Sequence, residues 1–356
     1  MRPKLPLKFS KKTNEVKEDV NTLLIDGNSL FKTSYHGAKS DFNKNGVHIG
    51  GIYQFLTVVR KLMNETVYHK AFVFWDGAFS GKLRYDIYED YKSDRGKDFI
   101  NGSEPVEEGY LDQQRQTMYY LDALYIKQLM DDIVESDDFI AQYVKDYSKD
   151  EKITICTNDS DMVQLVNENV RIYNCGSGKK FYIDHTNYQE KMKHYPGNAK
   201  LIKVISGDTS DSIKGIVGVK ETTLLKHFPM LTERKCELNE ILTEAKTIQE
   251  NRKVEKKKPL QALTNIIEGK TQGIQKDVYK VNEALVDLSN PLITNEAKNA
   301  LKELKTATME PNEERGMKEV FRMMKDDGLM DLIRDRNVDE YLLTFKKFIE
   351  RRKDNV

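Results

Sequence analysis

The chain has 356 residues with 57 basic and 57 acidic side chains, so its formal net charge is zero and does not indicate a partner. Its three cysteines form no CxxC pair and its six histidines form no HExxH motif, which excludes a cysteine zinc site. No apolar run approaches the length of a membrane span, and the N-terminus lacks the apolar core of a signal peptide. We expect a soluble protein of the cytoplasm with no membrane contact.

The first part of the chain alternates apolar strands with helices. Residues 1–20 are rich in lysine and lack periodicity, which predicts a mobile basic leader. Residues 22–26 and 71–76 are short apolar strands that end in an aspartate and a glycine, and residues 50–64 between them carry apolar side chains at helical spacing. This order predicts an α/β fold with a mainly parallel sheet flanked by helices.

A charged segment rich in tyrosine follows at residues 82–97. It could present cations and aromatic faces to a phosphate backbone, or it could be a solvated amphipathic helix. The residues that would make such contacts are Arg84, Tyr91, Lys92 and Arg95. Periodicity is lost between residues 99 and 109, and a helix is expected from residue 111 to 124.

The next elements bring further acids to places where elements begin or end. Glu135 opens a helix whose first turn holds Asp137 and Asp138, where carboxylates suit the helix dipole. The buried strand at residues 153–157 stops at Asn158-Asp159-Ser160-Asp161, and a helix is predicted after it. Two further strands are expected at residues 170–173 and 181–183.

A glycine-punctuated turn follows a helix that ends near residue 206. Asp208 and Asp211 lie at its start, and residues 213–220 lead into another helix. Two helices joined in this way predict a helix–turn–helix-like grip on a nucleic-acid backbone that does not distinguish bases. The expected contacts are Lys214, Gly215, Gly218, Lys220 and Lys226. Beyond residue 232 the sequence is polar and helical.

Acidic residues therefore collect at one kind of position. They are Asp26, Asp76, Glu135, Asp137, Asp138, Asp159, Asp161, Asp208 and Asp211. The carboxyl ends of strands in an α/β sheet form the edge where ligands bind, and so many carboxylates cannot all be ionised there without cations. Ligands that are all oxygen favour Mg²⁺ or Mn²⁺ over zinc. Two such ions about 4 Å apart would form the clamp used in phosphodiester hydrolysis.

Six motifs in order resemble the flap endonuclease/5′-nuclease family. They are Leu24-Ile25-Asp26-Gly27, Phe74-Trp75-Asp76, Tyr91-Lys92-x-x-Arg95, Glu135-x-Asp137-Asp138, Asn158-Asp159-x-Asp161 and Gly207-Asp208-x-x-Asp211. The resemblance covers roughly residues 22–228, and the stretch from Asp76 to Lys97 looks most like the ribonuclease H of T4-type bacteriophages. It implies a PIN-like nuclease domain at 21–205 with a helical arch at about 84–124, a helix–three-turn–helix element at 206–232 and a C-terminal helical region at 233–356.

The function that this resemblance implies is a structure-specific, metal-dependent 5′→3′ exonuclease or flap endonuclease. Its substrates would be DNA and RNA–DNA duplexes with 5′ ends, nicks or flaps, including RNA primers in DNA replication. It would act as a monomer in the cytoplasm, that of a host bacterium if the source is viral. A single-strand-binding protein or a sliding clamp would be its partner in replication.

The resemblance also assigns roles by position. Two ions, Mg²⁺ or Mn²⁺, would be shared among the acids. The first would use Asp26, Asp76, Glu135, Asp137 and Asp159, and the second Asp161, Asp208 and Asp211, with Asp138 near both. Lys92 and Arg95 at the base of the arch would steady the scissile phosphate, and Arg84 would help to bind the strand.

Two features depart from the family pattern. Lys220 stands where the family usually has a further glycine, which weakens the case for a monovalent ion there. Residues 101–116 carry four acids and only Arg115 as a base, so we expect an open or mobile arch rather than a basic threading hole. Two alternatives stay open: a PIN-type ribonuclease of single-stranded RNA and a catalytically silent nucleic-acid-binding scaffold. The element at 215–220 argues against the first, and the full set of acids argues against the second.

Overall fold

The computed structural model describes residues 20–93, 109–176, 178, 180–273, 277–333 and 337–353. The predicted leader at residues 1–19 lies outside the described residues. So does much of the predicted arch, at residues 94–108, with Arg95. Among the helices of the described ranges, none combines the length and the apolar character that crossing a bilayer requires.

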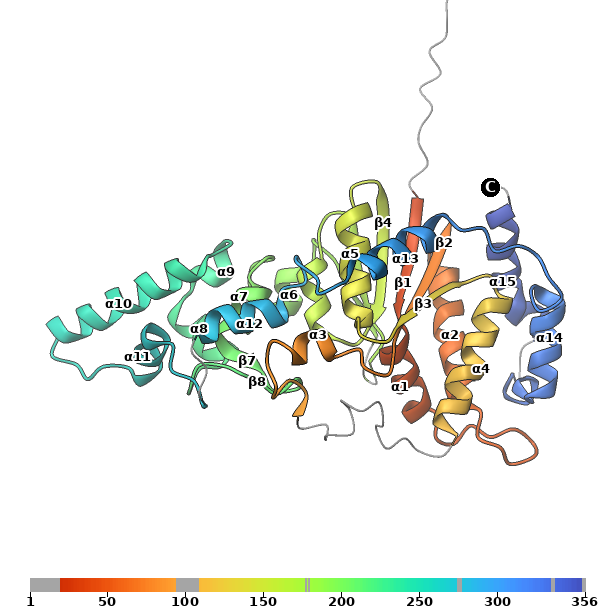
Figure 1. Cartoon of the computed structure of the whole chain (residues 1–356), viewed down its shortest axis with the longest axis horizontal. Coiled ribbons are helices and arrows are strands. Elements are labelled where there is room, and N and C mark those ends of the chain that lie inside the picture. Colours follow the sequence, from red (N-terminus) through yellow and green to blue (C-terminus); the bar gives the residue numbers. More distant parts are fainter. Residues whose placement is uncertain are drawn as a thin grey trace, which may run out of the picture.

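A six-stranded sheet in the order β3-β2-β1-β4-β5-β6 lies at the centre of the larger part of the molecule (Figure 1). The first five strands in this order are parallel, and β6 is antiparallel to β5. The strands are β1 (Val20–Asp26), β2 (Lys70–Asp76), β3 (Lys127–Asp131), β4 (Glu151–Thr157), β5 (Val170–Asn174) and β6 (Phe181–Ile183). This architecture confirms the predicted α/β fold with a mainly parallel sheet.

Helices cover both faces of this sheet because its strands are apolar on both sides. Successive side chains of β1 enter different cores: Leu23 and Ile25 enter one, and Leu24 enters the other. The first core is closed by α1 (Gly27–Gly37), α2 (Gly50–Glu65), α4 (Tyr110–Ala123), α14 (Met317–Asp326), the 3₁₀ helix η4 (Leu329–Leu332) and α15 (Val338–Lys353). The second is closed by α5 (Ser136–Tyr147), the 3₁₀ helix η3 (Ser160–Leu165), α6 (Tyr188–Met192) and α13 (Asn295–Thr306).

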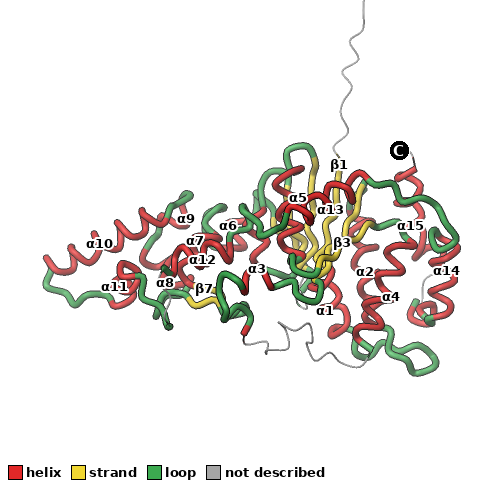
Figure 2. Tube along the Cα trace, viewed as in Figure 1, coloured by secondary structure: helices red, strands yellow, loops and turns green. Residues whose placement is uncertain are grey.

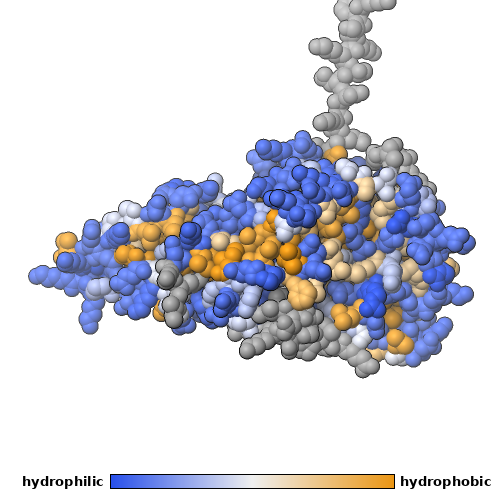
Figure 3. All heavy atoms as spheres, in the orientation of Figure 1, coloured by the Kyte–Doolittle hydropathy of each residue, from blue (hydrophilic) through white to orange (hydrophobic). Residues whose placement is uncertain are grey.

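A helical extension projects from one side of the sheet-containing part (Figures 1 and 2). It consists of α7 (Ala199–Ser206), β7 (Gly207–Asp208), β8 (Ile213–Lys214), α8 (Glu221–His227), α9 (Met230–Glu233), α10 (Leu238–Val254), α11 (Gln261–Glu268) and α12 (Val278–Val286). Its own core joins Ile205, Leu224 and Ile266. On the face in Figure 3, hydrophobic residues gather in a band where the extension meets the sheet-containing part. The chain then returns through α12 and α13, so the two parts are joined twice.

Three local elements differ from the sequence expectations. The helix α1 was not predicted, because Gly27-Asn28-Ser29 suggested a turn; Asp26 caps this helix by accepting a hydrogen bond from the Ser29 N–H at 3.0 Å. The strand β3 was also missed, because its side chains are only half-buried and lack an apolar run. The helix expected after Asp161 is the six-residue 3₁₀ helix η3.

Candidate active site

Three of the predicted acids lie at the carboxyl edge of the sheet. Asp26 is the last residue of β1, Asp76 is the last residue of β2, and Asp159 lies two residues beyond the end of β4. In Figure 1 this edge is the one where α1 begins and the short helix α3 (Lys82–Tyr85) lies. The N-terminus of α5 adds further acids, because Glu135 is its capping residue and Asp137 lies in its first turn.

Asp26 is the most deeply buried of the three, at 4% exposure. Its carboxylate accepts hydrogen bonds from the Ser29 N–H at 3.0 Å and from the Thr157 hydroxyl at 2.9 Å, which ties the end of β1 to the end of β4. Burial raises the pKa of Asp26 to about 7, and repulsion from Asp76 and Asp159 adds to the shift. The site thus holds a carboxyl group that is only partly ionised at neutral pH.

The neighbouring carboxylates are shifted in the same direction. Removal from water raises the pKa of Asp76, Asp137 and Asp159. Repulsion from Asp159, Asp26 and Asp76 raises the pKa of Asp137 further. The Ser136 N–H donates to Asp76 at 2.7 Å and fixes this side chain against the start of α5. Together these four aspartates, Asp26, Asp76, Asp137 and Asp159, form an acid cluster that favours the binding of cations.

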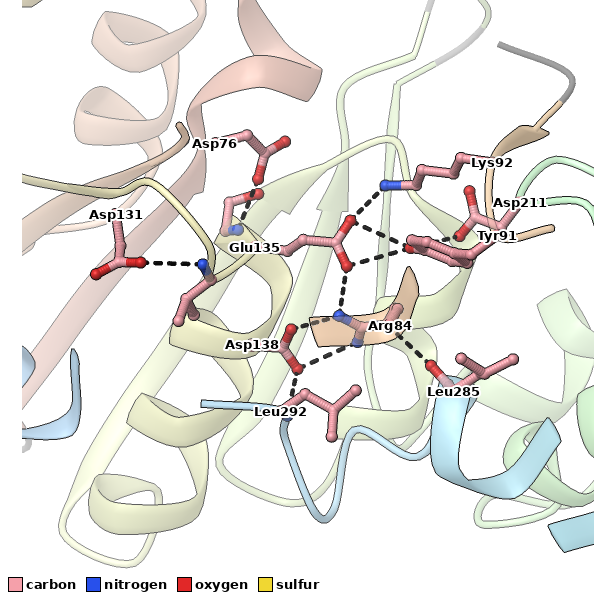
Figure 4. A network of polar contacts seen from close by, with 12 residues as sticks. Asp76, Arg84, Tyr91, Lys92, Asp131, Glu135, Asp138, Asp211, Leu285 and Leu292 are labelled. Carbon is pink, nitrogen blue, oxygen red and sulfur yellow. Dashed lines mark hydrogen bonds and ion pairs between the residues drawn. The ribbon is translucent and has the colours of Figure 1, made fainter. Parts of the chain in front are cut away.

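Glu135 behaves in the opposite way, although it is equally buried (Figure 4). Burial alone would raise its pKa, but Lys92 and Arg84 outweigh burial and lower the pKa to about 2. The Lys92 ammonium and the Arg84 guanidinium both pair with its carboxylate, and the Tyr91 hydroxyl lies 3.1 Å from each oxygen. Glu135 is therefore ionised and surrounded by donors.

Arg84 is the centre of this network rather than part of the outer surface (Figure 4). Only 6% of the residue is exposed, and its guanidinium pairs with Glu135 and Asp138 and donates to the Leu285 carbonyl at 3.0 Å. Asp138 accepts from Arg84 through both oxygens and also from the Leu292 N–H at 2.8 Å. The structure therefore places Arg84 inside this network, although the sequence suggested that it helps to bind a strand. Asp138 is directed at Arg84, and its expected place near both ions stays a prediction.

Two of the three acids expected to hold a second ion, Asp161 and Asp208, lie around Lys203 of α7. The Lys203 ammonium forms ion pairs with Asp161 and with Asp208, the latter at 2.5 Å. Burial would raise the pKa of Asp208, but Lys203 and Ser210 outweigh it and lower the pKa. Asp211 lies on the Lys92 side, where the Tyr91 hydroxyl is 3.3 Å from its carboxylate and the Lys92 N–H donates to its carbonyl at 2.9 Å.

The donor chemistry of these acids fits Mg²⁺ or Mn²⁺, because every candidate ligand is a carboxylate. Burial is the largest cause of the raised pKa values in the acid cluster, and repulsion between carboxylates adds to the shift of Asp26 and Asp137, so a bound cation would favour the ionised form of these groups. Within the described ranges, however, no three acidic, histidine or cysteine side chains already converge as a formed metal-binding group. The carboxylates are gathered at one edge without yet surrounding a common point.

The predicted nucleic-acid grip directly follows the acids in the chain, because β7 ends at Asp208. A short antiparallel pair, β7–β8, joins α7 to α8. A Cβ on Gly215 would lie 2.0 Å from the Ser206 carbonyl oxygen, so the pair can close only with glycine there. Gly218 is exposed and has φ +75°, a conformation that favours glycine. Three lysines of this segment, Lys214, Lys220 and Lys226, are exposed.

Several residues of the site were missed in the sequence. Thr157 and Asn28 connect strand ends, the latter by accepting from the Asp76 N–H at 3.1 Å. Ser136 orients Asp76. The position of Thr157 directly before Asn158-Asp159 is a signal that could have identified it. Lys203 carries no such signal, because nothing in the helix pattern distinguishes it from Lys200, the other lysine of α7.

A family match covers the part of the chain that holds the acid cluster, but not Asp208 and Asp211. Residues 21–193 match the family model described as the 5′-3′ exonuclease N-terminal resolvase-like domain. The 5′-3′ exonuclease of Mycoplasmopsis pulmonis is 28% identical over 59% of this chain and 67% of its own length. The DNA polymerase I of Lactococcus lactis is 31% identical over 59% of this chain but only 24% of its own length.

Solved structures share the fold over most of the chain. The 5′-exonuclease of bacteriophage T5, with divalent zinc ions bound, has a TM-score of 0.56 and 14% identity over 87% of this chain and 99% of that one. A variant of the T5 flap endonuclease, in a pseudo-enzyme-product complex with DNA and metal ions, has a TM-score of 0.55 and 14% identity over 88% of this chain and 99% of that one. At this identity the likeness establishes the fold alone.

Proposed function

We propose that this protein is a structure-specific 5′-nuclease of the flap endonuclease type that uses two divalent metal ions, and the match of residues 21–193 to the 5′-3′ exonuclease family model supports this proposal. It hydrolyses phosphodiesters near the 5′ end of nicked or branched duplexes. The finer resemblance to the ribonuclease H of T4-type bacteriophages extends the proposed substrates to RNA–DNA duplexes and RNA primers. A monomer acting with a single-strand-binding protein or a sliding clamp is part of the same proposal.

The observation that carries the proposal is the acid cluster at the carboxyl edge. Repulsion from other members of the cluster raises the pKa of Asp26 and Asp137, and Lys92 and Lys203 are already paired with other carboxylates, Glu135 and Asp208. We assign the first ion to these four aspartates with Glu135 beside them. We assign the second ion to Asp161, Asp208 and Asp211. Bound there, the ions would lower the pKa of an attacking water and stabilise the leaving oxygen.

The protein's own residues then hold and orient the phosphate. Lys92 lies at the edge of the acid cluster, and its backbone has the left-handed conformation at φ 53° that its hydrogen bond to the Asp211 carbonyl maintains. We propose that its ammonium, which pairs with Glu135 in this structure, steadies the charge that develops on the scissile phosphate. Arg95 is proposed for the same role by position in the family motif. Arg84 keeps Glu135 and Asp138 in place.

Duplex binding is proposed to run through the segment after the acids. Lys214, Lys220 and Lys226 are exposed on the segment that includes Gly215 and Gly218, which suits phosphate contacts that carry no base preference. Each lost phosphate contact should reduce the slope of log affinity against log salt by roughly one unit. A triple alanine variant with the wild-type slope would place the grip elsewhere.

The proposal is tested with 5′-labelled flap, nicked, RNA–DNA and single-stranded RNA substrates, each with Mg²⁺ and with EDTA. We expect cleavage near the 5′ end of the flap and nicked duplexes only with Mg²⁺. Full activity in EDTA would contradict the metal mechanism. Cleavage of single-stranded RNA alone would identify a PIN-type ribonuclease, and binding of duplexes without any cleavage would identify a silent scaffold.

A further inference from the structure

We infer that Lys203 is a built-in cation for the Asp161–Asp208 pair, so that the second divalent ion must displace it and binds more weakly than the first. The inference rests on the proposed two-ion function and deepens it by predicting the order in which the ions bind. Lys203 is then a positioning residue that holds two carboxylates together until the second ion arrives.

The geometry around Lys203 supports this role. Its ammonium forms one ion pair with an oxygen of Asp161 and a second with an oxygen of Asp208 at 2.5 Å. The remaining oxygen of Asp208 accepts from the Ser210 N–H at 2.8 Å and from the Ser210 hydroxyl at 2.5 Å. The Lys203 side chain is 21% exposed, against 16% for Asp161 and 9% for Asp208, so its ammonium lies in a partly dry environment. A charge pair is screened less there than on the open surface.

Two members of the acid cluster next to it lack such an ion pair, whereas the charges of Lys203 and Lys92 act on Asp159 and that of Lys92 acts on Asp76. Among the ion pairs formed by the described residues, none involves Asp26 or Asp137. These two carboxylates are instead repelled by their acidic neighbours. A divalent ion entering this cluster meets uncompensated negative charge, whereas one that approaches Asp161 and Asp208 meets the positive charge of Lys203. The protein therefore supplies one cation itself and leaves the other place to the metal.

A second lysine on the same helix offers a matched control. Lys200, almost one turn before Lys203 on α7, also bridges two carboxylates, Glu283 at 2.9 Å and Asp287 at 3.3 Å. Both of those acids belong to α12 and the residue after it, outside the proposed metal sites. Removing the charge of Lys200 should change the helix surface in a similar way without affecting metal binding.

The experiment is a calorimetric titration of the full chain with Mn²⁺, without nucleic acid, for the wild type and for Lys203→Met, Lys203→Arg and Lys200→Met. We expect two classes of site in the wild type. Lys203→Met should tighten the weaker class by roughly tenfold, the effect expected for one partly buried charge pair, and leave the tighter class unchanged. Lys203→Arg and Lys200→Met should keep the wild-type isotherm. Lys203→Gln, with a side chain of similar reach, replaces Lys203→Met if the latter does not fold.

The outcomes separate this inference from the function on which it rests. If the wild type binds no Mn²⁺, the two-ion function and the inference both fail. Two sites of equal affinity in the wild type overturn the inference alone. The inference is also overturned if the affinity of the weaker class of site is unchanged or lower in Lys203→Met. Lys203 would then only stabilise the local fold around Asp161 and Asp208.

Discussion

Glu151, at the amino end of the parallel strands, and the acid cluster, at their carboxyl end, differ in how the charge of their carboxylates is balanced. At the amino end, Glu151 opens β4 and accepts from Lys70 at 2.8 Å, Thr22 at 2.6 Å and Tyr143 at 2.8 Å, with Lys305 at 3.2 Å. Burial would raise its pKa, but these donors outweigh burial and lower the pKa. At the carboxyl end, the pKa of Asp26 is raised to about 7, mainly by burial and by Asp76.

This difference separates a carboxylate that stabilises the fold from carboxylates that we propose as metal ligands. Glu151 is satisfied by the chain itself, so nothing outside the protein is needed to keep it charged. The acid cluster has too few cations and hydrogen-bond donors to balance its carboxylates. The metal-free fold is therefore less stable, and a bound cation would stabilise it. Burial alone does not distinguish Glu151 from the acid cluster. The two differ in how many cations and hydrogen-bond donors surround their carboxylates.

The largest expected effect comes from removing one carboxylate of the acid cluster. Asp159→Asn should bring cleavage below detection, because a proposed metal ligand is lost. Without metal, the same variant should bind duplex as well as or better than the wild type, because less negative charge repels the phosphates. Cleavage in Mg²⁺, binding in EDTA and melting in EDTA are measured together; Asp211→Asn is expected to behave likewise.

Asp131→Asn is the matched control for this variant. Asp131 also ends a strand, paired in register with Asp76, but its carboxylate accepts from the Ile133 and Val134 N–H groups at 2.9 and 3.0 Å. It should retain cleavage. Wild-type cleavage by Asp159→Asn, or lost binding with a collapsed melting curve, would remove Asp159 from the metal site.

The next effect concerns Lys92, the cation that pairs with Glu135 beside the acid cluster. Lys92→Ala should slow the chemical step by roughly 10²- to 10³-fold, because a cation that meets developing charge acts mainly in the transition state. Duplex affinity should change much less. Single-turnover rates and equilibrium binding are compared with those of Lys82→Ala, a nearby exposed lysine that pairs with Asp86. Equal losses in rate and binding would make Lys92 an ordinary backbone contact.

Removing the charge of Glu151 should affect stability and not cleavage. Glu151→Gln should lower the free energy of unfolding by about 1–3 kcal/mol, because buried donors lose a charged acceptor while the lysines keep partial access to water. Cleavage by the folded variant in saturating Mg²⁺ should equal that of the wild type. Urea unfolding measures the loss, and Glu65→Gln, at an exposed acid that pairs with Lys61, should cost less. Lost cleavage by Glu151→Gln with an unchanged free energy of unfolding would contradict the comparison.

The smallest effect is the dependence of metal-free stability on pH. The pKa of Asp26 is raised from 3.8 to about 7, so its contribution to stability is fully present below pH 3.8 and is lost as the pH rises through 7. The lowered pKa of Glu151 has the opposite sign, because its contribution is present above its unfolded pKa of 4.5 and is lost as the pH falls through the folded value. In EDTA, Asp26→Asn should flatten the melting temperature between pH 5 and 7. If the melting temperature of Asp26→Asn depends on pH as that of the wild type does, Asp26 does not cause this pH dependence.

Much of the fold could be predicted because its signals are local. The apolar strands at β1, β2 and β4 and the amphipathic helix α2 follow from runs and periodicities within a few residues. The position of Asp26 and Asp76 at one edge followed from the same patterns, because parallel strands share their carboxyl end. The missed elements α1 and β3 have weak local signals, since one begins with a glycine and the other is a half-buried edge strand.

The sequence by itself determined which acids the protein brings to the sheet edge and that their ligand chemistry is all oxygen. The tertiary structure decided which of them remain uncompensated. Arg84 meets Glu135 and Asp138 across 51 and 54 residues of chain, and Lys203 meets Asp161 across a similar gap. Opposite charges neutralise each other effectively only within a few ångströms in space, and the separation of two residues along the chain does not give this distance. For that reason the sequence suggested only that Arg84 helps to bind a strand, and the fold places it as the cation that holds Glu135 and Asp138.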